Sequence, residues 1–168
     1  MQASDIVAVS SVAIAVIALA VSVYQSALIR RHNRQSVRPA LQLRARFRPG
    51  ERAGLRLVNA GLGPAVVTGS AVAVDGRHLG EYDLPSLDLL RGDDRPRPSA
   101  TTFSRGAILA TDYDEYLLSV EGFDPGVGWH AALAELVRDR LTVEIRYESL
   151  YGEQTFIVNW PARTPRED

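Results

Sequence analysis

Two carboxylates near the C-terminus have a spacing that could support acid–base chemistry. Glu148 and Glu153 both lie in the stretch RYESLYGE (146–153). Paired carboxylates act as general acid and general base when the surroundings of one of them raise its pKa. Gly152 favours a bend here, however, and a hairpin turn leaves both carboxylates in solvent. We interpret the stretch as a hairpin turn, and a hydrolase that uses the two glutamates remains an alternative.

The other candidate ligand residues do not form a metal-binding pattern. DYDEY (112–116) offers carboxylate oxygens to a divalent cation, but it lacks the glycine and the ligand spacing of an EF-hand loop. His32, His78 and His130 are far apart in the sequence, and none has a second ligand at helical spacing. We therefore predict no metal site, no Ser-His-Asp triad and no cofactor, and we expect that the protein is not an enzyme.

Composition excludes several further kinds of chemistry. The chain has no Cys, so disulfides and thiolate metal sites are excluded. It also has no Lys, which excludes a Schiff-base lysine and the lysine of a phosphate-binding loop. A length of 168 residues leaves room for one N-terminal anchor and one domain.

The stretch NAGLGPA (59–65) predicts a tight corner between two strands. Gly61 and Gly63 indicate either a left-handed backbone or the close approach of another segment. Pro64 restricts its neighbour, and the Asn59 amide can bond the turning backbone. A dinucleotide-binding loop needs a third glycine and a following helix, and this stretch has neither. We assign these residues a structural role.

Alternating hydrophobicity, together with turn signals between apolar stretches, predicts about seven short strands after residue 39. In ALQLRARFR (40–48), leucines alternate with arginines, so one face is apolar and the other is rich in arginine. The candidate surface residues on this strand are Arg44, Arg46 and Arg48. Further strands are expected at 55–59, 65–74, 99–109, 115–122, 141–149 and 154–160, with an Asp75-Gly76 turn after the second of these. We predict a mainly β fold, an antiparallel immunoglobulin-like β-sandwich or a small barrel.

Four other stretches lie between or after the predicted strands. Residues 84–92 are expected to form a helical turn or a short strand, and residues 128–140 one short amphipathic helix. Residues 91–99 have the composition of a polar surface loop, and residues 162–168 that of a flexible tail. The β-sandwich domain is therefore expected over 39–161.

An apolar run at the N-terminus predicts a transmembrane helix over residues 6–29. These 24 residues carry no charge. A helix of that length spans about 36 Å, more than the hydrocarbon core of about 30 Å. In lipid, a helix satisfies every backbone group within its own segment. A cleaved signal peptide is not expected, because the start MQASD (1–5) is acidic and the basic cluster follows the run.

Arginines after the run predict the side of the membrane on which the domain lies. Residues 30–48 contain seven Arg and no Asp or Glu. The positive-inside rule places this cluster in the cytoplasm and residues 1–5 outside. The expected membrane-interface residues are Tyr24, Arg30, Arg31, Arg34 and Arg38, and the arginines would meet anionic lipid headgroups. Residues 30–38 are expected to extend the helix.

Small side chains line one face of the predicted span. They are Ala8, Ser11, Ala15, Ala18 and Ser22, spaced alternately three and four residues apart. Such a stripe lets helices approach closely in lipid, so it is a candidate contact for a homo-oligomer. Ala and Ser are common throughout the run, however, and a stripe of Val and Leu lies one residue further on. A monomeric anchor therefore remains the other interpretation.

The distribution of charge argues against nucleic acid as a partner. The net charge is -1, and residues 49–168 contain twelve Arg against nineteen Asp and Glu. The basic excess lies beside the apolar run and on one predicted strand, rather than across the domain. Membrane lipids and a protein are the partners that we expect instead.

The chain resembles a group of uncharacterised small bacterial membrane proteins. These have one N-terminal transmembrane helix and a β-sandwich-like domain. The shared motifs are a juxtamembrane segment similar to RRHNRQSVRPAL (30–41), a corner similar to residues 59–65 and a final hairpin similar to YESLYGE (147–153). The resemblance covers most of the chain but not residues 77–110. It implies membrane attachment and a β-rich domain, and it brings no activity and no site residue.

We expect a single-pass protein of the bacterial inner membrane with a cytoplasmic binding module. The expected partner is a protein, which would contact an exposed sheet edge or the arginine-rich strand. A second hypothesis is a membrane effector, in which the domain senses a small molecule and the helices assemble through their small residues. The hydrolase hypothesis based on Glu148 and Glu153 is the third.

Overall fold

A computed structural model describes four parts of the chain, residues 14–26, 38–88, 98–152 and 154–161. The chain divides into two units, Met1–Val37 and Arg38–Asp168, and each is described by itself.

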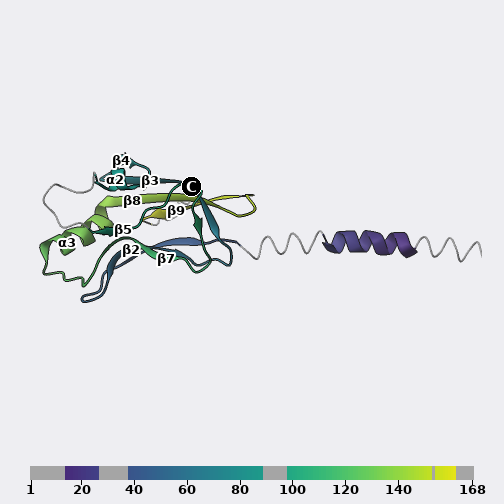
Figure 1. Ribbon diagram of the computed structural model, residues 1–168, viewed down its shortest axis with the longest axis horizontal. Coiled ribbons are helices and arrows are strands. Elements are labelled where there is room, and N and C mark those ends of the chain that lie inside the picture. Colours follow the sequence, from purple (N-terminus) through teal and green to yellow (C-terminus); the bar gives the residue numbers. More distant parts are fainter. Residues whose placement is uncertain (1–13, 27–37, 89–97, 153, 162–168) are drawn as a thin grey trace, which may run out of the picture. The chain divides into compact units, whose positions relative to one another are not determined.

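The described part of the first unit is helical. Residues 14–26 form an α-helix, drawn in purple in Figure 1. None of the helices in the four described ranges is long and apolar enough to cross a membrane. The predicted span of 6–29 is longer than this helix, and its residues 6–13 and 27–29 lie outside the described ranges.

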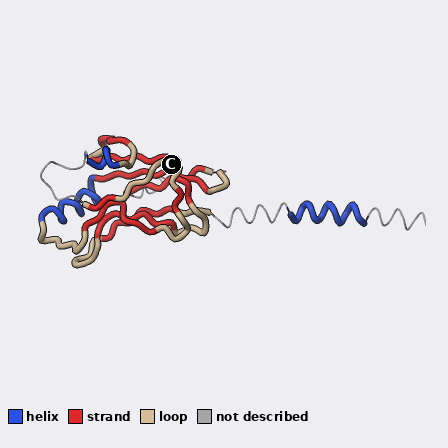
Figure 2. Tube along the Cα trace, viewed as in Figure 1, coloured by secondary structure: helices blue, strands red, loops and turns tan. Residues whose placement is uncertain are grey.

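The second unit is mainly β with antiparallel sheets, which confirms the coarse fold prediction. Its elements are β1 (Leu41–Arg46), β2 (Ala53–Asn59), β3 (Ala65–Val74), β4 (Arg77–Gly80), α2 (Leu84–Asp88), β5 (Ser99–Ala100), β6 (Ile108–Leu109), β7 (Asp114–Val120), α3 (Gly128–Glu135), η1 (Leu136–Arg140), β8 (Leu141–Ser149) and β9 (Thr155–Trp160). One sheet has the strand order β1-β2-β7-β5, and the other has the order β4-β3-β8-β9 with β6 paired to β3. Figure 2 shows the strands of the domain, in red, as two layers, with its helices, in blue, near one end.

Side chains that alternate along the strands of both sheets form one core. On β8, Val143 and Ile145 are buried while Thr142 and Arg146 are exposed, as the period of two requires. The sheets are also joined by a hydrogen bond, in which the backbone N–H of Leu41 on β1 donates to the Tyr147 hydroxyl on β8 at 3.2 Å. The buried residues of β8 therefore belong to this core, and its exposed residues face away from it.

The Asp75-Gly76 turn forms as predicted, and it is followed by a strand that was not predicted. Val74 pairs with Arg77, and the two residues between them have φ of 52° and 78°. Two left-handed residues give a turn whose twist matches that of the flanking strands. The new strand, β4, has only four residues, RHLG, and these show no alternation.

The prediction of one strand over residues 99–109 is wrong. β5 pairs with β7 in one sheet, whereas β6 pairs with β3 in the other. Between them the chain turns, with the Ala107 N–H donating to the Ser104 carbonyl at 3.0 Å and Gly106 at φ 86°. The segment therefore crosses from one sheet to the other.

The stretch 84–92, for which a helical turn and a short strand were both open, is helical where it is described, and so is the predicted helix of 128–140. Residues 84–88 form α2, and residues 128–140 form α3 and the π-helical turn η1. His130 is buried on α3, where its Nδ1 accepts the Asp124 backbone N–H at 2.9 Å, so it has a structural partner. The predicted tail of 162–168 and residues 91–97 of the predicted polar loop lie outside the described ranges.

Candidate functional site

The outward side chains of β1, β2 and β7 form rows across the sheet. In the central row, Arg44 on β1 pairs with Arg56 on β2, and Arg56 pairs with Tyr116 on β7. The two flanking rows are Gln42, Val58 and Asp114 on one side, and Arg46, Gly54 and Ser119 on the other, where Gly54 has no side chain and Ser119 is buried. We call this surface the arginine face and define it by Arg44, Arg46, Arg52, Arg56 and Tyr116.

A β-bulge brings Tyr116 opposite Arg56. Leu55 pairs with Leu118, but the next residue, Arg56, pairs with Tyr116, so that Leu117 is passed over. Leu117 and Leu118 are both buried. A bulge changes the direction of the side chains that follow it. In a regular ladder Arg56 would instead lie opposite Leu117, and the central row would lack its aromatic ring.

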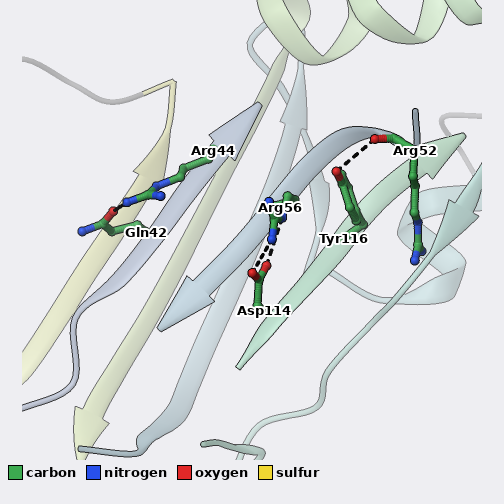
Figure 3. Close-up of polar contacts among 6 residues, drawn as sticks. All are labelled: Gln42, Arg44, Arg52, Arg56, Asp114 and Tyr116. Carbon is green, nitrogen blue, oxygen red and sulfur yellow. Dashed lines mark hydrogen bonds and ion pairs between the residues drawn. The ribbon is translucent and has the colours of Figure 1, made fainter. Parts of the chain in front are cut away.

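The Tyr116 ring lies between two guanidinium groups (Figure 3). The Cζ atoms of Arg52 and Arg56 are 4.8 Å and 5.3 Å from the ring centroid. The Tyr116 hydroxyl donates to the Arg52 carbonyl at 3.0 Å, which fixes the ring. Each cation above an aromatic face gains about 0.5–1 kcal/mol at an exposed site. The three side chains therefore form an ordered stack.

Carboxylates pair with most of the arginines on this face. Asp114 accepts two hydrogen bonds from Arg56, one of them from Nε to Oδ1 at 2.9 Å. The other pairs are Arg52 with Glu121 at 3.0 Å, Arg46 with Glu51 at 2.5 Å, and the neighbouring Arg48 with Glu51 at 4.0 Å. These exposed or half-exposed pairs neutralise charge but contribute little stability.

Arg44 is the exception. Its Nε donates to the neutral Gln42 amide oxygen at 3.1 Å, and no carboxylate in the described ranges pairs with it. Directly opposite lies Arg56, whose guanidinium is turned towards Asp114 (Figure 3). Like charges opposite each other in a sheet are destabilising. The face therefore presents an exposed cation whose charge is not balanced.

The predicted membrane residues are described only in part. Ala15, Ala18, Ser22 and Tyr24 are exposed on the helix of residues 14–26. Ala8, Ser11, Arg30, Arg31 and Arg34 lie outside the described ranges, and Arg38 is exposed where the second unit begins.

Asn59 holds the corner between β2 and β3. Its side chain is only 3% exposed. Its Oδ1 accepts the backbone N–H groups of Ala40 and Gly61, each at 3.1 Å. Its Nδ2 donates to the carbonyls of Gly63 at 2.8 Å and Ala110 at 2.9 Å. One buried amide therefore links three separate segments of backbone.

Gly61 is required in this corner by a close approach. A Cβ atom at this position would lie 2.3 Å from the Arg38 carbonyl oxygen and 2.4 Å from the Ala40 nitrogen. Gly61 and Gly63 are not among the glycines with positive φ, so the left-handed alternative does not apply. Pro64 follows, half-buried, just before β3.

The residues considered first for chemistry are not brought together in the described structure. Glu148 is half-buried on β8 and pairs with Val66 and Thr155, while Glu153 lies outside the described ranges. In the acidic stretch 112–116, Asp114 is bound to Arg56. No three His, Asp or Glu side chains in the described ranges are grouped so that they could hold a metal ion.

Sequence reasoning missed Arg52, Arg56, Asp114 and Tyr116. The alternation of LRLVN could have indicated that Arg56 points outward, because Leu55 and Leu57 on either side of it are buried. Nothing local indicates which residue of β7 lies opposite it, because the bulge sets that register.

No protein-family model, curated protein or solved structure matches the chain. The arrangement of side chains is therefore the basis on which a function can be proposed.

Proposed function

We propose that the protein is a single-pass membrane protein whose cytoplasmic domain binds an acidic segment of a protein partner on the arginine face. The observation that carries this proposal is the unbalanced cation Arg44 opposite Arg56. A carboxylate placed beside both guanidinium groups would pair with Arg44 and would reduce the repulsion between the two arginines. Arginine suits this role because its planar donors bind carboxylates in a bidentate manner.

A structural reason for arginine on β1 accounts for only part of this face. β1 is an edge strand of its sheet, and charged side chains on edge strands prevent sheets from pairing with each other. That explanation does not extend to Arg52, Arg56 and Tyr116, because β2 and β7 are inner strands. Arginine and tyrosine are also enriched where proteins bind each other. Binding of a protein partner would account both for the arginines on β1 and for the stack of Arg52, Tyr116 and Arg56.

The order of the strands supports an immunoglobulin-like sandwich. In that fold one sheet has the order ABED, and the other contains CFG and can be extended by a strand C′ next to C. With β1, β2, β3, β4, β5, β7, β8 and β9 taken as A, B, C, C′, D, E, F and G, the two observed orders follow this scheme. Many domains with this architecture serve as binding modules, although fold alone does not establish function.

The membrane part of the proposal rests on the sequence. Residues 6–29 are apolar and uncharged, and the arginines that follow favour a cytoplasmic domain. The helical residues 14–26 are compatible with this span. Anchoring would confine the domain to the membrane surface and would raise its effective concentration near a partner at that surface.

In-cell photocrosslinking tests the binding proposal directly. A photoreactive amino acid replaces Gln42, beside Arg44 on the arginine face, and Thr142, exposed on β8 in the other sheet, serves as the control position. We expect a specific adduct with an acidic segment of another protein from position 42 and none from position 142. Equal adducts at both positions, or none at position 42, would contradict the proposal.

The effector hypothesis makes a different demand on the helix. Ala15, Ala18 and Ser22 lie on one face of a helix, because they are three and four residues apart. If the helices assemble on ligand binding, Ala15→Leu with Ala18→Leu should abolish ligand-dependent oligomers. The binding-module proposal instead predicts that crosslinking from position 42 is unchanged in this double variant.

A further inference from the structure

Two exposed leucines project from the end of the domain at which Arg38 lies. Leu62, at the tip of the corner between β2 and β3, is 75% exposed, and Leu150, in the turn between β8 and β9, is 58% exposed. Tyr151, next to Leu150, is 55% exposed. Single exposed apolar side chains are common on protein surfaces, so the position of these residues in the fold decides what they indicate.

Both exposed tips lie at the end of the domain where its first residue, Arg38, is found. The Gly63 N–H donates to the Arg38 carbonyl at 3.3 Å, so Leu62 lies next to the first residue of the unit. Ala65, which begins β3, pairs with Ser149, which ends β8, so Leu150 lies at that end as well. Figure 1 shows β8 and β9 running to the turn that joins them at one end of the domain. We call this the proximal end and define it by Arg38, residues 59–65 and residues 149–152.

Leu62 is held in its exposed position by a built corner. Buried Asn59 bonds the backbone on both sides of it, at Gly61 and at Gly63. Gly61 also packs against the backbone of residues 38–40 so closely that a Cβ atom would not fit. The corner therefore cannot fold Leu62 back onto the domain without breaking these contacts, and the exposure is a fixed property of the fold.

The chain between the predicted span and this end is short. Eight residues, 30–37, separate Ile29 from Arg38. Fully extended, nine residue steps reach at most about 30 Å, and any other conformation reaches less. If residues 6–29 span the membrane, the proximal end therefore stays within about 30 Å of the point at which the chain leaves the hydrocarbon core.

We infer that the proximal end docks on the lipid surface, with Leu62 and Leu150 inserted at the membrane–water interface. This inference rests on the proposed membrane anchor and adds how the domain is oriented. Leucine and tyrosine side chains are favoured at that depth. Asp112 is exposed at this end too, because the carbonyl of its neighbour Tyr113 accepts the Asn59 backbone N–H. Exposed Arg38 would attract anionic lipid, whereas Asp112 would repel it. The contact is therefore apolar in origin and does not require anionic lipid.

Docking would also set the position of the arginine face. β1 begins at the proximal end, so Gln42, Arg44 and Arg46 would follow at increasing distance from the lipid, rising by at most about 3.4 Å per residue. The arginine face would then stand beside the membrane and remain open to a partner at the same surface.

The absence of cysteine allows this inference to be tested with single labels. The full chain is reconstituted into vesicles of zwitterionic phosphatidylcholine, with Leu62→Cys or Leu150→Cys carrying an environment-sensitive fluorophore. Arg77→Cys is the control, because Arg77 is exposed and pairs with Val74, at the other end of β3 from Ala65. Each label is then quenched by iodide in the water and, separately, by nitroxide-labelled lipid.

Docking predicts opposite quenching at the two ends of the domain. Labels at 62 and 150 should be quenched by nitroxide lipid and quenched by iodide about threefold less than the label at 77, because interfacial insertion excludes water. Leu62→Asp in the chain labelled at 150 should raise iodide quenching towards the value at 77. Equal quenching at all three positions in a chain that floats with the vesicles would overturn docking and leave the anchor intact. A chain that does not float with vesicles would overturn the anchor itself.

Discussion

Arg44 and Arg56 lie directly opposite each other on β1 and β2, and their guanidinium groups bind different partners. Arg56 turns to Asp114 and stacks on Tyr116, whereas Arg44 donates to the amide oxygen of Gln42 and pairs with no carboxylate in the described part of the chain. Asp114 therefore balances the charge of Arg56, whereas neutral Gln42 does not balance the charge of Arg44. We attribute this imbalance to a site for an anionic partner.

Reversing the charge of Arg44 should abolish binding and should leave the domain stable. Arg44→Glu removes the cation that we expect the partner to meet, and crosslinking from position 42 should be lost. The new carboxylate would lie opposite Arg56, and such a pair contributes about 0.2–1 kcal/mol in a sheet. We therefore expect the free energy of unfolding to rise by a similar amount, measured by urea denaturation.

Arg146→Glu is the matched control for this change. Arg146 lies on β8 in the other sheet and pairs with Glu144 at 2.7 Å. The substitution should leave crosslinking unchanged and lower the free energy of unfolding by a few tenths of a kcal/mol, the scale of an exposed ion pair. Loss of the adduct in both variants would show a general effect of charge rather than a site at Arg44.

Removing the Asn59 amide should destabilise the domain. Asn59→Ala leaves the N–H groups of Ala40 and Gly61 without their acceptor, and an unsatisfied buried group costs about 1–3 kcal/mol. We expect a loss of about 2–4 kcal/mol, read from the tryptophan fluorescence of the domain in urea. Asn159→Ala on β9 makes the same chemical change away from the corner and should stay within about 0.5 kcal/mol of the parent. Similar losses in the two variants would contradict the role of Asn59.

A methyl group at Gly61 should be tolerated poorly. Gly61→Ala would place its Cβ atom 2.3 Å from the Arg38 carbonyl oxygen, so the backbone would have to move, at a cost of about 1–3 kcal/mol. At Gly128, at the start of α3, a Cβ atom meets nothing within 4 Å. Gly128→Ala should therefore be neutral or stabilising by up to about 1 kcal/mol. Thermal unfolding of the two variants compares them, and equal midpoints would disprove the close approach.

The stability of the domain should fall in alkaline solution. Burial, and to a lesser degree nearby Tyr113, raises the pKa of Tyr82 far above the ordinary value of 10.0. Because the folded-state pKa is the higher one, the stabilisation is complete below pH 10 and is lost as the pH rises above it. The expected loss is about 1.4 kcal/mol per pH unit for this side chain.

Tyr82→Phe isolates this contribution. The Tyr82 hydroxyl donates to the Leu117 carbonyl at 2.8 Å, so the variant should be less stable by about 1 kcal/mol at neutral pH. Between pH 10 and pH 11.5 its free energy of unfolding should nevertheless fall less steeply than that of the parent. Parallel slopes in urea denaturation over this range would show that Tyr82 does not titrate on unfolding.

Local patterns in the sequence predicted those features that depend on neighbouring residues. Alternation predicted β1 and β2, and Asp75-Gly76 predicted its turn, because side-chain direction and turn geometry are local properties. The split of residues 99–109 between two sheets was missed, because the choice of a pairing partner is made by distant strands. The short strand β4 was missed because it owes its conformation to pairing with β3.

For the candidate site too, local patterns predicted some features, and features that depend on distant strands were missed. Arg44 and Arg46 could be placed on one face from their own strand. The partner opposite Arg44 depends on the register of β1 and β2, and Tyr116 reaches the same row only through the bulge at Leu55 and Arg56. The pairing register between distant strands therefore determines that the arginines of β1 share one surface with the stack of Arg52, Tyr116 and Arg56.

Reporter fusions to Asp168 test the central claim, a cytoplasmic domain on a membrane anchor, most directly. Alkaline phosphatase is active only outside the cytoplasm, whereas a fluorescent protein can report a cytoplasmic location. We predict fluorescence in the membrane fraction and no phosphatase activity. Phosphatase activity would reverse the orientation inferred from the arginine cluster, and fluorescence in the soluble fraction would contradict the anchor.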